Sequence, residues 1–294
     1  MYYITNNKDT IIFEPYFNKK LDIDLISGFA KLIFSNYRLE HKLFEEYKNN
    51  NYKNNDHNNI TYTHSRFNKP VSNLPSSITH LIFGDNFNKK VDNLPSNITC
   101  LTFSNDFNQE VNDLPLNITC LTFGNNFNQE VNNLPLNIIY LTFGKKFNQE
   151  VNNLPQSITH LTFGFYFNQK VDNLPSSIKE ITFSIKFNQM IENLPISIHK
   201  IIFDEKISSK YYEKISGKYY EKISSKRYNR ICEYCEFNVE LNNLPNFIEF
   251  IQLPKKYNKK ILCLPKKLNY IVCSKKYEFI DDFIGCNVVN YDFE

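Results

Sequence analysis

The sequence of 294 residues contains no tryptophan, a single alanine (Ala30), two methionines and only seven glycines. Alanine and methionine favour helices, so their scarcity argues against a helix-rich fold. By contrast, 43 residues are asparagine, a residue that favours turns and helix caps over helix interiors. The chain is also 41% hydrophobic and 15% aromatic, which is ample material for a core and excludes disorder throughout.

The sequence also lacks a run of about 18 apolar residues and an apolar stretch among its first ten residues, so we expect neither membrane insertion nor a signal peptide. Its seven cysteines form an odd, scattered set, which favours free thiols in a reducing compartment over a disulfide framework. We therefore expect an intracellular protein. The net charge of +3 gives the chain as a whole no electrostatic preference for nucleic acid or for an acidic partner.

A period of 20 residues organises the middle of the chain. The repeated unit reads Ile-x-x-Leu-x-Phe-(Gly/Ser)-x-x-Phe-Asn-x-x-Val-x-x-Leu-Pro-x-(Ser/Asn). Its second phenylalanine recurs without a slip at Phe67, Phe87, Phe107, Phe127, Phe147, Phe167 and Phe187. One unit cannot bury its six apolar side chains, whereas stacked units can, so the sequence predicts a solenoid.

The pattern within one unit predicts the path of a coil. Leu121-Thr122-Phe123 alternates with period 2, which indicates a short strand with Leu121 and Phe123 inside and Thr122 outside. Gly124 ends this strand, and Pro135 favours an extended return path. The roughly ten residues of the return are too few for a helix with its turns, so we expect an extended or 3₁₀ convex side. The expected fold is a solenoid with one parallel β-sheet on its concave side, about 20 residues per coil and little α-helix.

The period extends beyond the regular block and divides the chain into five segments. We expect degenerate N-terminal coils and a cap, a polar Asn-rich insertion, the regular repeats, a basic low-complexity insertion, and degenerate C-terminal coils with a cap. These segments are residues 1–37, 38–59, 60–205, 206–230 and 231–294. Twelve strands are expected, one of them a degenerate strand at Ile60-Thr61-Tyr62 before Phe67, with a possible thirteenth at Ile231.

Stacking in register places equivalent residues of successive coils in columns, two of which are polar. One column is the asparagine after each phenylalanine, and the other precedes each Leu-Pro. The first contains Asn88, Asn108, Asn128, Asn148, Asn168 and Asn188, and the second Asn93, Asp113, Asn133, Asn153, Asn173 and Asn193. Both are interpreted as structural, because side-chain amides can satisfy backbone groups of the adjacent coil.

The concave face is where we expect a partner to bind, because its columns vary from coil to coil. One column is formed by the residues that precede each strand leucine or isoleucine: His80, Cys100, Cys120, Tyr140, His160, Glu180 and Lys200. Exposed aromatic side chains are frequent binding hot spots. The candidate partner-binding residues are a predicted aromatic cluster together with a histidine: Tyr140, His160, Phe165, Tyr166 and His80.

Catalytic and metal sites are not expected. His80, Cys100 and Cys120 occupy consecutive rungs of one column, but a fourth zinc ligand is not evident. Cys232 and Cys235 form one C-x-x-C pair without a partner motif, so buried thiols are favoured there. The sequence contains no G-x-S-x-G, G-x-x-x-x-G-K or H-E-x-x-H motif and no convergent acid, base and nucleophile. We therefore expect no cofactor, no metal and no enzymatic activity.

Lysines are concentrated near the C-terminal end. Between residues 255 and 276 there are eight lysines and no acid, and residues 206–230 add eight basic and two acidic residues. The candidate basic patch is Lys255, Lys256, Lys259, Lys260, Lys266 and Lys267. Two interpretations stay open: solvated coil edges, or a surface for nucleic acid, an acidic protein or an anionic membrane.

The repeated unit, with its Phe-Asn and Leu-Pro-x-(Ser/Asn)-Ile signatures, closely resembles the FNIP repeat, a variety of leucine-rich repeat expanded in social amoebae and in large DNA viruses of amoebae. The resemblance is strong from Arg66 to about Asp204 and weak over most of the remainder. One departure is that an asparagine stands where the leucine-rich pattern has its final leucine.

The resemblance implies a leucine-rich-repeat-like solenoid for protein interaction. We expect the chain to bind a host or viral protein, as a monomer in the host cytoplasm. Some viral relatives carry an N-terminal F-box that recruits a ubiquitin ligase, which would make the solenoid a substrate receptor. No Leu-Pro-x-Glu-like F-box opening is found here, and residues 11–34 resemble coils instead. The ubiquitin-ligase receptor therefore stays an alternative to a general interaction scaffold.

Overall fold

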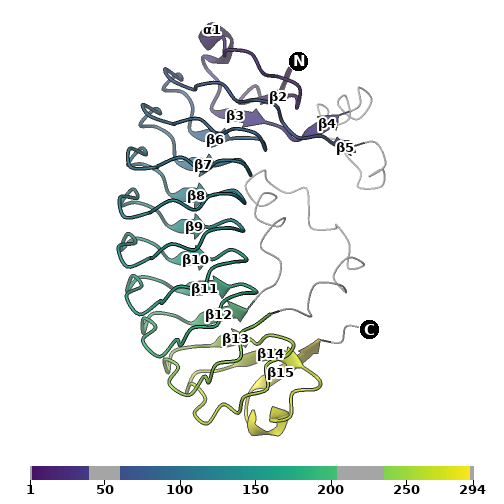
Figure 1. Ribbon diagram of the computed structural model, residues 1–294, viewed down its shortest axis with the longest axis vertical. Helices are drawn as coiled ribbons and strands as arrows, with labels where there is room; N and C mark the ends of the chain where they lie inside the picture. Colours follow the sequence, from purple (N-terminus) through teal and green to yellow (C-terminus); the bar gives the residue numbers. More distant parts are fainter. Residues whose placement is uncertain (1, 40–59, 204–234, 292–294) are drawn as a thin grey trace. The chain divides into compact units, whose positions relative to one another are not determined.

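The computed structural model describes residues 2–39, 60–203 and 235–291 (Figure 1). Thirteen strands follow one another in one sheet in chain order, while β4 (Tyr37–Leu39) and β5 (Ile60–Tyr62) form a separate antiparallel pair. This confirms the predicted solenoid with a parallel sheet, about 20 residues per coil and almost no helix. Two compact units, residues 1–127 and 128–294, make up the chain and are described in turn.

The first unit contains the N-terminal coils and the first regular repeats. Besides β4 and β5, its elements are β1 (Tyr2–Ile4), β2 (Thr10–Phe13), α1 (Ile23–Ile26), β3 (Lys31–Phe34), β6 (His80–Ile82), β7 (Cys100–Thr102) and β8 (Cys120–Thr122). The strand pairs from β2 to β8 are parallel, whereas β1 pairs antiparallel with β2. Strand β1 was not predicted, and it covers the edge of the sheet that β2 would otherwise leave unpaired.

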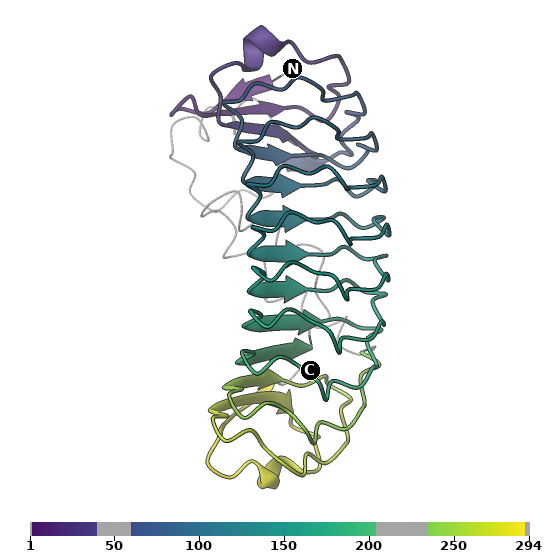
Figure 2. The ribbon, with the colours of Figure 1, turned by 90° about the vertical axis from the view of Figure 1, so that its left-hand side faces the viewer.

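The second unit carries the remaining repeats and the C-terminal coils. Its elements are β9 (Tyr140–Thr142), β10 (His160–Thr162), β11 (Glu180–Phe183), β12 (Lys200–Phe203), β13 (Phe250–Gln252), β14 (Tyr270–Ser274), a 3₁₀ turn at Ile280–Asp282 and β15 (Asn287–Tyr291). Each strand pairs with the next in parallel, so that within this unit the strands lie side by side (Figure 2). No helix in the described segments is long and apolar enough to cross a bilayer.

Stacked phenylalanine rings form the core of each coil. In the second unit the rings of Phe163 and Phe167 have centroids 3.7 Å apart within one coil, and Phe167 and Phe187 are 6.1 Å apart in adjacent coils. All three side chains are fully buried. The residue two before Phe163, Leu161, points into the same core, as the period of a strand requires. Dispersion and the buried apolar area of these rings hold one coil against the next.

The asparagine that follows the second phenylalanine forms a ladder, as predicted. The Oδ1 atom of Asn148 accepts the backbone N–H of Asn168 at 2.8 Å, and the Oδ1 atom of Asn168 accepts that of Asn188 at 2.8 Å. Equivalent bonds in the first unit join Asn68 to Asn88 and Asn88 to Asn108. The amide side chain thus replaces the hydrogen bond that a strand would make between coils.

Two members of the second asparagine column bond differently from the prediction. Asn153 and Asn173 are exposed, and their Nδ2 atoms donate to the side chains of Asn132 and Asn152 rather than to backbone groups. Their position just before the buried Leu-Pro leucine falls in an open turn, so the surrounding backbone groups can bind water.

The expected strand at Ile60-Thr61-Tyr62 exists as β5, but it does not join the main sheet, where β3 pairs directly with β6. The ring of Phe67 stacks on Phe34 at 3.8 Å, which is the distance within one coil. The chain therefore leaves a single coil after Phe34 and returns before Phe67. The second insertion leaves its coil at the equivalent point, because Phe203 and Phe237 stack at 4.1 Å. The possible strand at Ile231 lies outside the described residues, as do residues 40–59 and 204–234.

Candidate functional site

Six side chains from adjacent strands form a row on the open face of the sheet in the second unit, which is the face opposite the phenylalanine core. Each is the first residue of its strand, and the strands pair in register, so the six stand one above the next. We name this row the open-face column; it consists of Tyr140, His160, Glu180, Lys200, Phe250 and Tyr270.

Direct contacts link five members of the open-face column. The His160 imidazole stacks on the Tyr140 ring with centroids 4.5 Å apart, and its Nε2 lies 3.7 Å from Glu180 Oε1. Glu180 Oε2 lies 3.1 Å from Lys200 Nζ, which also lies 5.6 Å from the ring centroid of Phe250. The charges of the column therefore pair with one another, and aromatic rings flank them on both sides.

The two ends of the column are exposed and its middle is half-buried, an arrangement that suits a binding surface. Tyr140 and Tyr270 are 47% and 49% exposed, whereas the residues between them are half-buried. A tyrosine at each end thus presents a large ring to solvent at a low cost in side-chain entropy when it binds.

His160 is held in a defined orientation and protonation state. Its Nδ1 lies 2.7 Å from the hydroxyl of Thr159, and that hydroxyl donates to the carbonyl of Ile139. The Nε2 atom of His160 faces the Glu180 carboxylate at 3.7 Å. Burial lowers the pKa of His160 below 6.5, with further lowering from nearby cations, while the Glu180 carboxylate opposes the shift. The imidazole is therefore neutral at pH 7.

The residue two positions further along each strand forms the floor beside the column. Thr142 and Thr162 were expected on the outside and do point away from the core, but they are buried rather than exposed. Thr142 and Thr182 stand in register on the two sides of Thr162 at the spacing of adjacent strands, about 4.8 Å, which leaves little room for water. The open face is therefore floored by tightly packed small side chains.

The predicted aromatic cluster is divided into two pairs. The rings of Phe165 and Tyr166, in the loop after β10, contact each other with centroids 4.7 Å apart. In the described part of the chain, no ring contact joins this pair to Tyr140 and His160. The two pairs lie at opposite ends of the short strands, because Tyr140 and His160 begin β9 and β10, whereas Phe165 and Tyr166 follow β10. Tyr166 is 45% exposed, and Lys145 Nζ lies 5.3 Å from the Phe165 centroid.

Phe250 and Tyr270 were missed as site residues in the sequence. They continue the column because Lys200 pairs in register with Phe250, fifty residues later. The insertion interrupts the 20-residue numbering, but the signal was present: each residue precedes the isoleucine of a recovered repeat, Ile251 or Ile271.

His80 belongs to the first unit, where it opens β6 and pairs in register with Cys100, which in turn pairs with Cys120. Its Nδ1 lies 2.8 Å from the Thr79 hydroxyl, and burial together with Lys31 lowers the pKa of the imidazole. Nowhere in the described segments do three or more His, Cys, Asp or Glu side chains gather as a possible metal site.

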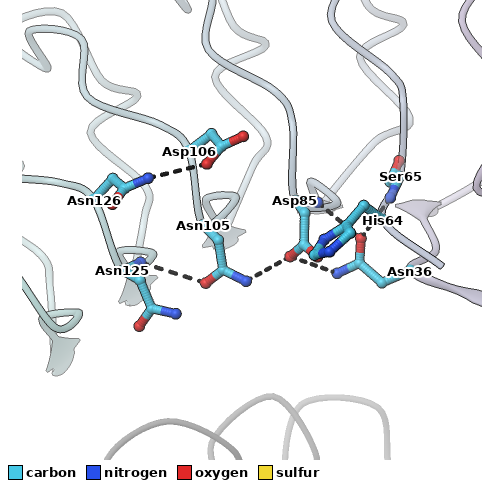
Figure 3. Close-up of polar contacts among 8 residues, drawn as sticks. All are labelled: Asn36, His64, Ser65, Asp85, Asn105, Asp106, Asn125 and Asn126. Atoms are coloured by element: carbon cyan, nitrogen blue, oxygen red, sulfur yellow. Dashed lines mark hydrogen bonds and ion pairs between the residues drawn. The ribbon is translucent and has the colours of Figure 1, made fainter. Parts of the chain in front are cut away.

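A polar cluster in the first unit joins the two ends of the first insertion to the regular coils (Figure 3). Asp85, only 3% exposed, accepts from the side-chain amides of Asn36 and Asn105, and its Oδ2 lies 2.7 Å from His64 Nδ1. Asn36 Oδ1 in turn accepts the backbone N–H groups of Ser65 and Asp85 at 3.0 and 2.8 Å. Because both carboxylate oxygens are occupied by these side chains, the cluster is suited to holding the coil closed rather than to catalysis.

The six lysines of the predicted basic patch lie at three places along the C-terminal coils. They are Lys255 and Lys256 after β13, Lys259 and Lys260 in the first return turn, and Lys266 and Lys267 after Pro265. Lys260 Nζ lies 3.2 Å from Asp282 Oδ2, and Lys267 Nζ lies 4.8 Å from the Phe247 ring centroid.

The regular block matches a known repeat family. Residues 67–206 match the family model described as FNIP Repeat, over the segments 67–106, 107–146, 130–166, 147–186 and 167–206. Residues 67–206 carry FNIP repeats. The resemblance read from the Phe-Asn and Leu-Pro signatures is thereby confirmed, and the FNIP block covers β6 to β12.

Among solved structures, this chain is similar to CroV588, a giant-virus protein described as a novel circular LRR protein. The two share 28% sequence identity with a TM-score of 0.64, over 94% of this chain and 38% of CroV588. This chain thus spans little more than a third of the length of that neighbour. The likeness supports a leucine-rich-repeat-like fold. No curated protein matches the sequence.

Proposed function

We propose that this FNIP-repeat protein is a non-enzymatic scaffold whose open-face column binds a host or viral protein. The observation that supports this most directly is the linked row from Tyr140 to Phe250, with exposed tyrosines at positions 140 and 270. Aromatic side chains around a half-buried charge pair are the composition of an interface centre.

The rigidity of the coils supports the same proposal. The asparagine ladder and the stacked phenylalanines fix the backbone on which the column stands, as between Asn148 and Asn168. A surface that is ordered before binding loses less entropy in the complex, so more of the contact energy contributes to affinity.

The chemistry of the column favours binding over catalysis. Glu180 and Lys200 neutralise each other at 3.1 Å, and His160 faces Glu180 rather than a nucleophile. Catalytic groups instead converge on a point where a substrate atom can sit. Phe165 and Tyr166 supply a second aromatic contact for the same partner, at the far end of the strands.

Photo-crosslinking in the full-length chain tests the proposal. We would place benzoylphenylalanine at Tyr140 and, as a control in the same coil, at Leu136, which is 72% exposed in the return turn. In a lysate of infected amoebae, the probe at position 140 should give a discrete protein adduct that excess unlabelled chain removes and that the position 136 probe does not give. Equal adducts at both positions, or none at position 140, would count against the proposal.

The same experiment addresses the ubiquitin-ligase alternative. If the chain is a ligase substrate receptor, a Skp1-like subunit should co-purify with it from the lysate whether or not Tyr140 is changed. If neither a Skp1-like subunit nor its ligase partners are recovered, the scaffold proposal is favoured over the receptor.

A further inference from the structure

Two cysteines of the first unit stand side by side on the open face of the sheet. Cys100 opens β7 and Cys120 opens β8, and the two are direct register partners in this parallel pair. Side chains at register partners of parallel strands point the same way, at the strand spacing of about 4.8 Å. Both thiols are half-buried, so they are shielded yet reachable from solvent.

The two thiols interact directly. The Cys100 and Cys120 side chains lie close enough for a contact between the two thiols, as their register pairing requires. The Thr119 hydroxyl lies 4.0 Å from Cys120 Sγ and donates to it. Thiolate is the form of cysteine that binds metal ions.

The geometry of the row restricts the coordination number. His80 is the next register partner on the other side of Cys100, so three rungs span roughly 9.6 Å. An ion held between the two sulfurs is therefore out of reach of His80, in agreement with the absence of any three-ligand group within residues 2–39, 60–203 and 235–291. A tetrahedral zinc site does not fit, because it needs four ligands around one point.

We propose that Cys100 and Cys120 bind one soft, thiophilic cation of the Cu(I) class in two-coordinate sulfur–metal–sulfur geometry. Two-coordinate binding needs two sulfurs that face one ion from opposite sides, and register partners on neighbouring strands present their thiols side by side. Thiolate ligands select Cu(I) over harder cations. Binding displaces the thiol protons to solvent, and no electron transfer is involved.

A disulfide fits this pair less well. It requires Cβ atoms about 3.5–4.5 Å apart, whereas register partners of parallel strands are held near the strand spacing. The site is thus better suited to an ion between two separate sulfurs than to a bond between them.

Anaerobic titration of the reduced full-length chain with Cu(I), in competition with bicinchoninate, tests the inference. One ion should bind per chain, and X-ray absorption should report two sulfur ligands. Cys100→Ser and Cys120→Ser should each weaken binding at least tenfold. Cys263→Ser, which changes an exposed cysteine outside the row, should leave it unchanged.

A second measurement works without any variant. Bound Cu(I) should protect Cys100 and Cys120 from alkylation in the native chain, as read by mass spectrometry, while Cys263 stays reactive. The inference is overturned if both serine variants retain the ion, if Cys235→Ser abolishes binding instead, or if alkylation of the two thiols proceeds unchanged in the presence of Cu(I).

Discussion

The imidazole of His160 stacks on the ring of Tyr140 at 4.5 Å while its Nε2 faces the Glu180 carboxylate at 3.7 Å. This one side chain therefore links the exposed aromatic end of the open-face column to its charged middle. Because burial keeps the ring neutral at pH 7, the link is a packing contact rather than an ion pair under neutral conditions.

Acidification should destabilise the protein through its half-buried histidines. The pKa values of His80 and His160 lie below 6.5 in the folded chain, mainly because of burial, so the unfolded chain binds more protons as pH falls through 6.5. Their full contribution to stability is present above pH 6.5 and is lost below it. Urea unfolding at pH 7.5 and 5.5 should show a smaller free-energy difference in the His80→Gln, His160→Gln double variant than in the native chain. An equal difference in both would contradict the assignment.

Removing one rung of the asparagine ladder should destabilise the fold. In Asn148→Ala the backbone N–H of Asn168 loses its acceptor, so the free energy of unfolding should fall by about 0.5–1.5 kcal/mol. Asn148→Asp keeps an acceptor oxygen at the same place and serves as the matched control. Denaturant titration of both variants measures the effect. If alanine proves no worse than aspartate, the ladder does not contribute as described.

Close approach of neighbouring coils should make Gly164 intolerant of a side chain. A Cβ atom at this position would lie 1.7 Å from the carbonyl oxygen of Gly144 in the coil before it. Gly164→Ala should therefore cost about 1–3 kcal/mol, as overpacking does elsewhere. Ser184 occupies the equivalent position in the next coil and already has a Cβ, so Ser184→Ala is the control and should cost less. Thermal melting of the two variants compares them.

The second insertion should be removable without loss of the fold. Replacing residues 204–234 by one glycine gives Phe203-Gly-Cys235-Glu236-Phe237, the spacing of a regular coil, and Phe203 and Phe237 already stack at 4.1 Å. The shortened chain should melt cooperatively at or near the native temperature, because loop closure costs little entropy when its ends are adjacent. A control that also deletes Cys235 should be clearly less stable, since two residues cannot span the turn.

The repeat made most of this architecture predictable from the sequence. Leu161, Phe163 and Phe167 recur with their equivalents at a fixed period, so strand, core and ladder positions could be assigned coil by coil. The place where the first insertion leaves its coil could not be assigned. Ile60-Thr61-Tyr62 alternates like any strand of the sheet, and only the stacking of Phe67 on Phe34 shows to which coil Phe67 belongs.

The candidate site was predictable in part for the same reason. Tyr140 and His160 were identified because they occupy a named position in regular repeats. The full column was not, because its continuation to Phe250 depends on which strand follows β12 after the insertion. The separation of Phe165 and Tyr166 from His160 was not predicted either: His160 begins β10, whereas Phe165 and Tyr166 follow it, so the strand holds the two aromatic pairs apart.

The most direct test of the open-face column is the affinity of the captured partner for two double variants of the full-length chain, measured by calorimetry. Tyr140→Ala with Tyr270→Ala removes the exposed rings of the column. Leu136→Ala with Leu262→Ala removes apolar side chains that are 72% and 68% exposed in the return turns. We expect the first pair to weaken binding at least tenfold, about 1.4 kcal/mol, and the second to leave the affinity within twofold. Equal affinities for both double variants would contradict the assignment of partner binding to this face.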